Sequence, residues 1–165
     1  MTVVTAGQTI TVRVADAAVA EGDHTLVTLG LGSCVAIVLH HPGRRVGALA
    51  HVLLPDEALS RDTTNRAKFA TTAVPLLVER LAAYGPLAGT TARLIGGARM
   101  FAQLLPQGGI NMGERNVHAC RAALAAAGLP VLAEDTGGEH GRSVYFHVGT
   151  GRVTIRSVRA GIREL

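Results

Sequence analysis

Short apolar runs alternate along the chain with turns that are rich in glycine, proline and polar residues. Short apolar runs bounded by such turns are typical of buried strands. The pattern predicts strands over residues 10–14, 26–29, 35–39, 46–54, 92–95, 131–133, 143–148 and 152–158. Most of the predicted elements are therefore strands.

Two segments instead repeat apolar residues at the three- and four-residue spacing of a helix. The first helix is predicted over 72–84, with Pro75 in its first turns and Gly85-Pro86 as its stop. The second is predicted over 116–127, and its spacing places Cys120 on the apolar face. Together these elements predict an α/β (α+β) fold with a mixed β-sheet core and flanking helices.

The turn His41-Pro42-Gly43 joins two of the predicted strands into a hairpin. Paired strands of similar length bring their far ends together. Cys34, at the start of the first strand, and His51, near the end of the second, are therefore predicted to be neighbours although they are far apart in sequence.

Composition narrows the class of protein. A chain of 165 residues suits a single domain over 1–165, and its core must be aliphatic, because aromatic residues make up 3% and tryptophan is absent. We expect a cytoplasmic protein with no membrane insertion, because the N-terminus has no signal-peptide pattern and no run approaches the roughly 20 apolar residues of a membrane span. The two cysteines are expected to be reduced.

The net charge of +4 is only a weak indication of a nucleic-acid partner. Arg152 and Arg156 alternate with Val153 and Ile155, which is typical of a strand with one solvated face. Aromatic stacking residues and recognised nucleic-acid motifs are missing from the sequence. We therefore expect no nucleic-acid partner.

The main candidate chemistry is that of a thiol. Gly30, Gly32 and Ser33 form a turn that presents Cys34, and backbone N–H groups near Ser33 and Gly32 are candidates to bind a substrate oxyanion. A nearby imidazole can accept the thiol proton, which makes Cys34 and His51 a candidate nucleophile and base. Taken alone, however, a free cysteine is often a small buried hydrophobe and a strand histidine is often structural.

Other chemistries fit the sequence less well. Seven histidines and two cysteines could build a zinc site, but no Cys-x-x-Cys, His-Glu-x-x-His or His-x-Glu signature is present. A dinucleotide loop would need glycine where Val35 stands, and a Walker loop would need a Gly-Lys pair. We expect no metal and no cofactor, and we expect Cys120 to be structural.

Five ordered blocks of the sequence resemble a known family. These are Leu31–Val35, Ala50–Pro55, Gly96–Phe101, Gly113–Val117 and the segment from Asp135 to Arg142. The chain resembles the chemoreceptor glutamine deamidase family, CheD. That resemblance implies a cysteine-hydrolase sandwich fold related to bacterial toxin deamidases, and a catalytic set of Cys, His and Thr that matches Cys34, His51 and Thr28.

The resemblance also implies what the protein acts on. Its substrates would be glutamines on the cytoplasmic domains of methyl-accepting chemoreceptors, and its location would include the receptor arrays. A CheC-type phosphatase would be a further partner. Two other functions stay open: a binding module that acts by occupying these partners, and a thiol hydrolase of receptor methyl esters. Asn116 and Arg142 are candidates to line or brace the site.

Overall fold

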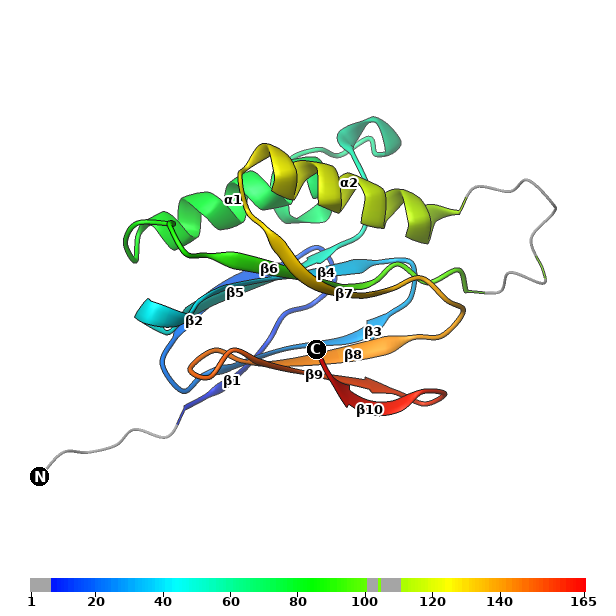
Figure 1. The fold of residues 1–165 in the computed structure, drawn as a ribbon. Coiled ribbons are helices and arrows are strands. Elements are labelled where there is room, and N and C mark those ends of the chain that lie inside the picture. Colours follow the sequence, from blue (N-terminus) through cyan, green and yellow to red (C-terminus); the bar gives the residue numbers. More distant parts are fainter. Residues whose placement is uncertain (1–6, 101–103, 105–110) are drawn as a thin grey trace, which may run out of the picture.

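Two five-stranded sheets stack face to face, and two helices cover the outer face of one of them (Figure 1). This computed structural model describes residues 7–100, 104 and 111–165. The sheet under the helices has the order β2 (Ala17–Glu21), β5 (Val46–Val52), β4 (Val35–His41), β6 (Thr91–Gly96) and β7 (Val131–Thr136). The second has the order β1 (Thr9–Thr11), β3 (Thr25–Leu31), β8 (Arg142–His147), β9 (Arg152–Ser157) and β10 (Gly161–Glu164).

Both sheets are mixed. The pairs β1–β3 and β6–β7 are parallel, and the other neighbouring pairs are antiparallel. The helices are α1 (Ala70–Ala82) and α2 (Met112–Ala126), and short 3₁₀ turns cover Pro42–Arg44, Glu57–Leu59 and Arg66–Lys68. The mixed α+β architecture is as predicted, but the core contains two sheets. The helices lie on one outer face only, because the second sheet covers the other face of the first.

The hairpin β4–β5 is the centre of the fold, and it confirms the predicted pairing. Its continuous apolar run is explained by burial on both faces. Val35 and Ile37 pack in the cluster under the helices, whereas Ala36 and Val38 pack in the cluster between the sheets. The register pairs Val35 with Val52 and Ala36 with His51. The start of β4 and the end of β5 therefore meet at one end of the sandwich.

Several predicted boundaries were wrong. The strand predicted over 10–14 ends at Thr11, because the chain then crosses to the other sheet through a turn in which Ala15 has a φ of 58°. The helix predicted over 72–84 spans Ala70–Ala82. The helix predicted over 116–127 begins at Met112 because the Asn111 side chain caps it, accepting a hydrogen bond from the Glu114 N–H at 3.0 Å.

Two strands, β2 and β10, were not predicted at all. Both are edge strands of their sheets. The strand β2 has the sequence Ala-Ala-Val-Ala-Glu and β10 has Gly-Ile-Arg-Glu, so neither shows a regular alternation of apolar and polar residues. Such segments become strands through pairing with a neighbour. Among the described residues, no helix is long and apolar enough to span a membrane.

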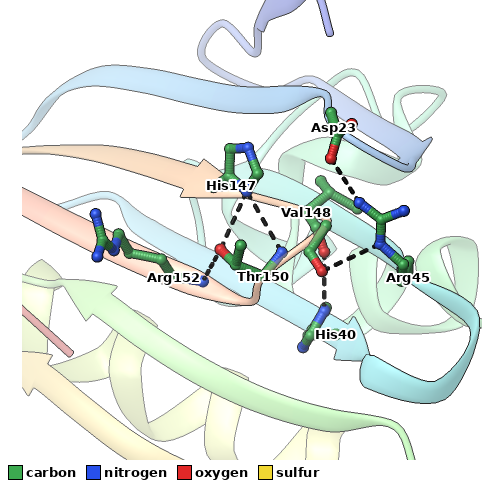
Figure 2. Close-up of polar contacts among 8 residues, drawn as sticks. Asp23, His40, Arg45, His147, Val148, Thr150 and Arg152 are labelled. Atoms are coloured by element: carbon green, nitrogen blue, oxygen red, sulfur yellow. Dashed lines mark hydrogen bonds and ion pairs between the residues drawn. The ribbon is translucent and has the colours of Figure 1, made fainter. Parts of the chain in front are cut away.

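At the end of the hairpin β4–β5 away from Cys34, polar side chains connect the hairpin to the loops next to the second sheet (Figure 2). There the His40 side chain reaches across to the Val148 carbonyl at 2.9 Å, and Arg45 forms an exposed ion pair with Asp23 at 2.5 Å. His40 also packs edge-on against the Phe146 ring. These contacts join the hairpin β4–β5 to the second sheet at its far end.

Candidate active site

Cys34 lies in the short connection between β3 and β4, which carries the chain from one sheet to the other. Three successive carbonyls of this connection accept hydrogen bonds. The Gly32 carbonyl accepts from the Ala98 N–H at 2.9 Å, and the Cys34 carbonyl accepts from the Gly97 N–H at 2.8 Å. The Ser33 carbonyl accepts from the side chain of Asn116 at 2.9 Å. The backbone that carries the thiol is therefore held on both sides.

His51 lies on β5, and hydrogen bonds hold its backbone as they hold that of the β3–β4 connection. Its carbonyl accepts from the Ala15 N–H at 2.9 Å, and its own N–H donates to the Asp16 carbonyl at 3.0 Å. Both partners belong to the crossover between β1 and β2. The His51 side chain is 1% exposed and points into the space between the two sheets, on the same face as Ala36.

Thr28, on β3 of the second sheet, reaches across to this imidazole. Its Oγ1 lies 2.7 Å from His51 Nδ1 and 2.6 Å from the Val12 carbonyl oxygen. A carbonyl can only accept, so the single hydroxyl proton goes to Val12, and His51 Nδ1 must donate to Thr28. The neutral imidazole therefore has its proton on Nδ1 and a free lone pair on Nε2. His51 Nε2 is buried and has no hydrogen-bond partner among the described residues.

Cys34 lies on the same face of the sheet as His51. It packs against the cluster that contains Ala36 and Leu49. Since Ala36 is directly opposite His51, Cys34 is the diagonal neighbour of His51, at a backbone separation of roughly 7–8 Å that a long side chain can bridge. No hydrogen bond joins the thiol to the imidazole in the described part of the chain. Such contacts are often long in free enzymes and tighten with substrate.

Burial sets the protonation state of both groups. It lowers the pKa of His51 to about 4, so the imidazole is neutral at neutral pH. Burial also raises the pKa of the Cys34 thiol above its usual value, and the hydrogen bond from the backbone N–H of Cys34 partly offsets this effect. The resting pair is therefore a neutral thiol beside a neutral imidazole, and a reaction that used the thiol as nucleophile would have to remove its proton.

The connection also carries candidate oxyanion donors. Although the Gly32, Ser33 and Cys34 carbonyls are all paired, the N–H groups of Ser33 and Cys34 donate to no other residue in the described part of the chain. The N–H of Cys34 is close enough to its own sulfur to stabilise the thiolate. Free N–H groups beside a nucleophile can bind the oxyanion of a tetrahedral intermediate.

Asn116 and Arg142 both lie close to the β3–β4 connection. Asn116, on α2, is fully buried and donates to the carbonyls of Ser33 and Leu53 at 2.9 and 3.1 Å. Arg142 pairs with Leu31 in the β3–β8 ladder and donates from Nε to Asp135 at 3.1 Å. Asn116 therefore bonds to the connection that carries Cys34, and Arg142 lies on the strand that pairs with the end of β3, so that their role in the site stays a prediction. One part of the site could not be predicted from the sequence. The Val12 group that accepts the Thr28 hydroxyl proton is a backbone carbonyl, which every residue has, so the residue type gives no signal.

The remaining candidates lie elsewhere. Cys120 is fully buried under the helices, and burial raises its pKa to about 12, which agrees with the predicted structural role. In the described ranges, no group of three or more His, Cys, Asp or Glu side chains is placed to hold a metal ion. Surface cavities of about 870 and 630 Å³ lie near the β3–β4 connection: Gly97, whose N–H bonds to the Cys34 carbonyl, lines the larger one, and Gly30 of β3 lines the smaller one. Phe101, in one of the five sequence blocks, lies outside the described residues.

Comparison with known proteins decides the family. The family model for CheD, described as CheD chemotactic sensory transduction, matches residues 53–157. A protein of Desulforamulus reducens named "Probable chemoreceptor glutamine deamidase CheD" is 40% identical over 157 residues, which cover 94% of this chain and 95% of the relative. The chain belongs to the CheD family.

Further CheD proteins align with this chain over a similar length. The "Chemoreceptor glutamine deamidase CheD" of Halalkalibacterium halodurans is 40% identical, and the "Probable chemoreceptor glutamine deamidase CheD 2" of Geobacter metallireducens is 43% identical. Each alignment covers 94% of this chain and 98% of the relative. The CheD model match begins after Thr28, Cys34 and His51, but alignments that cover 94% of the chain necessarily include these three positions.

Proposed function

We propose that this chain hydrolyses the side-chain amides of specific glutamines on the cytoplasmic domains of methyl-accepting chemoreceptors, giving glutamates and ammonia. Membership of the CheD family and the names of the relatives support the substrate. The observation that carries the chemistry is the Thr28–His51 hydrogen bond. It leaves His51 Nε2 as an acceptor on the same sheet face as Cys34.

In the proposed reaction, His51 Nε2 takes the proton of Cys34 while the sulfur attacks the amide carbon. A C–S bond forms, and the carbonyl oxygen becomes an oxyanion that the free N–H groups of Ser33 and Cys34, next to Gly32, bind. His51 then gives its proton to the amide nitrogen, the C–N bond breaks and ammonia leaves. The product of this half-reaction is a thioester on Cys34.

Water completes the cycle. His51 Nε2 removes a proton from water, the resulting hydroxide attacks the thioester carbon, and the C–S bond breaks. The sulfur leaves as the thiolate and recovers a proton from His51, and the substrate side chain leaves as glutamate. Throughout both halves, Thr28 accepts the Nδ1 proton and holds the ring in one orientation, which is the task of a carboxylate in other triads.

The biological setting of this proposal follows from the family. The protein would adjust receptors in chemotactic adaptation, act in the cytoplasm at receptor arrays and associate with a CheC-type phosphatase. Its sandwich would be related to the cysteine-hydrolase fold of bacterial toxin deamidases. The mechanism needs no cofactor and no metal, so activity should withstand exhaustive chelation and be lost on alkylation of Cys34.

The test compares two cysteine variants on a purified cytoplasmic receptor fragment. Wild-type protein should release ammonia and convert particular glutamines to glutamates, as read by peptide mass spectrometry. Cys34→Ala should abolish both signals, whereas Cys120→Ala should retain most of the activity, because Cys120 packs in the cluster between the helices and the first sheet and Cys34 packs in the cluster between the sheets. Circular dichroism checks that both variants fold.

Three results would contradict the proposal. Unchanged turnover in Cys34→Ala would show that Cys34 is not the nucleophile. Equal losses in both folded variants would show that the two thiols do not have separate roles. Release of methanol from methylated receptors, with no ammonia from amidated ones, would assign the same site to methyl esters.

A further inference from the structure

Asn116 connects the strand end that carries the proposed nucleophile with the strand end that carries the proposed base. Its Nδ2 donates to the Ser33 carbonyl, one residue before Cys34, and to the Leu53 carbonyl, two residues after His51. Carbonyl oxygens only accept, so the amide nitrogen must face them and both of its protons are used. One side chain therefore bonds to both segments at once.

This bridge begins where the β4–β5 ladder stops. The last pair of the ladder is Val35 with Val52. Beyond it the two chains separate, since the Leu53 and Leu54 N–H groups both donate to the Lys68 carbonyl rather than to the β4 side. Without the ladder, backbone hydrogen bonds no longer fix the distance between these ends. The Asn116 amide replaces the missing bonds at the level of Cys34.

Two glycines bring α2 close enough for this contact. A Cβ at Gly113, one turn before Asn116, would lie 2.4 Å from the carbonyl oxygens of Gly97 and Ala98. A Cβ at Gly97 would lie 2.3 Å from Val117 Cγ2. Real Cβ atoms do not approach so closely, so any larger residue at either position would push the start of α2 away from β6. The sequence block Gly113–Val117 therefore contains both the glycine that allows the close packing and the asparagine that makes the bridge.

Packing alone does not account for an asparagine at this position. Asn116 is fully buried, and its Oδ1 has no hydrogen-bond partner among the described residues. An unpaired buried acceptor is unfavourable, so an apolar residue would suit this helix face better if filling space were the only requirement. The two donated bonds are what the amide supplies.

We propose that Asn116 is a positioning residue for the deamidation reaction, holding Cys34 at the distance and angle from which His51 Nε2 can take its proton. This inference rests on the proposed function. Asn116 touches neither substrate nor reacting atoms and acts through the backbone of Ser33 and Leu53. It should affect the rate of the chemical step and not the binding of the receptor.

The experiment replaces Asn116 with leucine, which keeps the branched shape of the side chain and removes both donors. Steady-state kinetics on the receptor fragment should show kcat lowered roughly 10- to 100-fold, as small misplacements of reacting groups do, with KM nearly unchanged. Leu124→Ala is the control. Leu124 is fully buried on the same helix but contacts neither carbonyl, so this variant lowers the melting temperature while keeping kcat near the wild-type value.

A second measurement needs no receptor. Alkylation of Cys34 by iodoacetamide near neutral pH depends on removal of the thiol proton, and should slow in both Asn116→Leu and His51→Gln. At high pH, where the thiolate forms without a base, the rates in Asn116→Leu and wild type should agree. If wild type releases no ammonia but Asn116→Leu still slows neutral alkylation, the proposed function fails and the positioning role stands.

The positioning role is wrong if folded Asn116→Leu keeps wild-type kcat and neutral alkylation, or if its losses equal those of Leu124→Ala at the same melting temperature. If the leucine variant does not fold, Asn116→Ser replaces it in the same assays. Serine fills less space and offers one proton, so it cannot bridge both carbonyls and should lower kcat and neutral alkylation. Wild-type rates in a folded serine variant would overturn the proposal.

Discussion

The two ends of the hairpin β4–β5 each carry a buried histidine that reaches across to the second sheet, and only the one at the Cys34 end is proposed to take part in catalysis. His40 and His51 both lie on the face between the sheets, and burial lowers the pKa of each. His40 Nε2 is 2.9 Å from the Val148 carbonyl, and His51 Nδ1 is 2.7 Å from the Thr28 hydroxyl. Burial and a hydrogen bond across the sandwich are therefore common to both ends.

The difference lies in which nitrogen is occupied and what lies beyond it. A carbonyl partner, that of Val148, places the His40 proton on Nε2 (Figure 2). The ring packs edge-on against Phe146 and close to Gly151. The hydroxyl partner of His51 holds the proton on Nδ1, and the free Nε2 lies on the sheet face that carries Cys34. A buried histidine becomes a candidate base when its partner orients the ring and leaves the far nitrogen open beside a nucleophile.

The largest expected effect separates these two histidines directly. His51→Gln should lower kcat about 100-fold or more, because a positioned general base is lost. His40→Gln should keep kcat near wild type and lower the unfolding free energy by about 1–2 kcal/mol, through the lost aromatic contact and a poorer hydrogen bond. Ammonia release and chemical denaturation measure the two quantities. Equal losses of kcat in both folded variants would remove the distinction between the two ends.

A smaller effect is expected at Thr28. Thr28→Val keeps the branched shape but leaves the His51 Nδ1–H unpaired, and one lost buried hydrogen bond of about 1–3 kcal/mol corresponds to roughly 10- to 100-fold in kcat. Thr28→Ser keeps the oxygen and should retain more activity than the valine variant. Wild-type turnover in Thr28→Val would reduce the site to Cys34 and His51. A serine variant slower than the valine variant would show that Thr28 mainly packs.

The smallest effect should come from the far end. Asp23→Asn removes the ion pair with Arg45, in which both side chains are about half exposed. Exposed pairs of this kind contribute about 0–1 kcal/mol, so the unfolding free energy should change by no more than that and kcat should not change. A clear loss of turnover would instead mean that the far end is coupled to the site.

The sequence predicts the hairpin and the nearness of Cys34 and His51 because local patterns encode both. The two continuous apolar runs on either side of the turn at Pro42 are sufficient for the pairing of β4 with β5. The start of α2 was missed although Asn111 and Glu114 form a capping pattern that marks a helix start, because Gly113 interrupts the helical repeat.

The contacts between sheets could not be predicted from periodicity. Thr28 and His51 belong to different sheets, and their separation depends on how the sheets stack. Only the family resemblance pointed to Thr28. The bridge from Asn116 likewise depends on the close approach of α2 to β6. Two glycines allow this approach, and the periodicity of the sequence does not predict it. The same holds for the carbonyl of Val12, whose part in the site comes from backbone placement alone.

The most direct test of the proposed base is nitrogen NMR of the histidine side chains across a pH titration. His51 should carry its neutral-state proton on Nδ1 and titrate near its lowered pKa of about 4, well below the ordinary 6.5. It would then be neutral and able to accept a proton throughout the neutral range, and kcat/KM would fall only as the pH drops towards that value. His40, with its proton on Nε2, serves as the internal reference. A proton on Nε2 of His51, or titration near the ordinary value, would contradict the assignment of His51 as the base that activates Cys34.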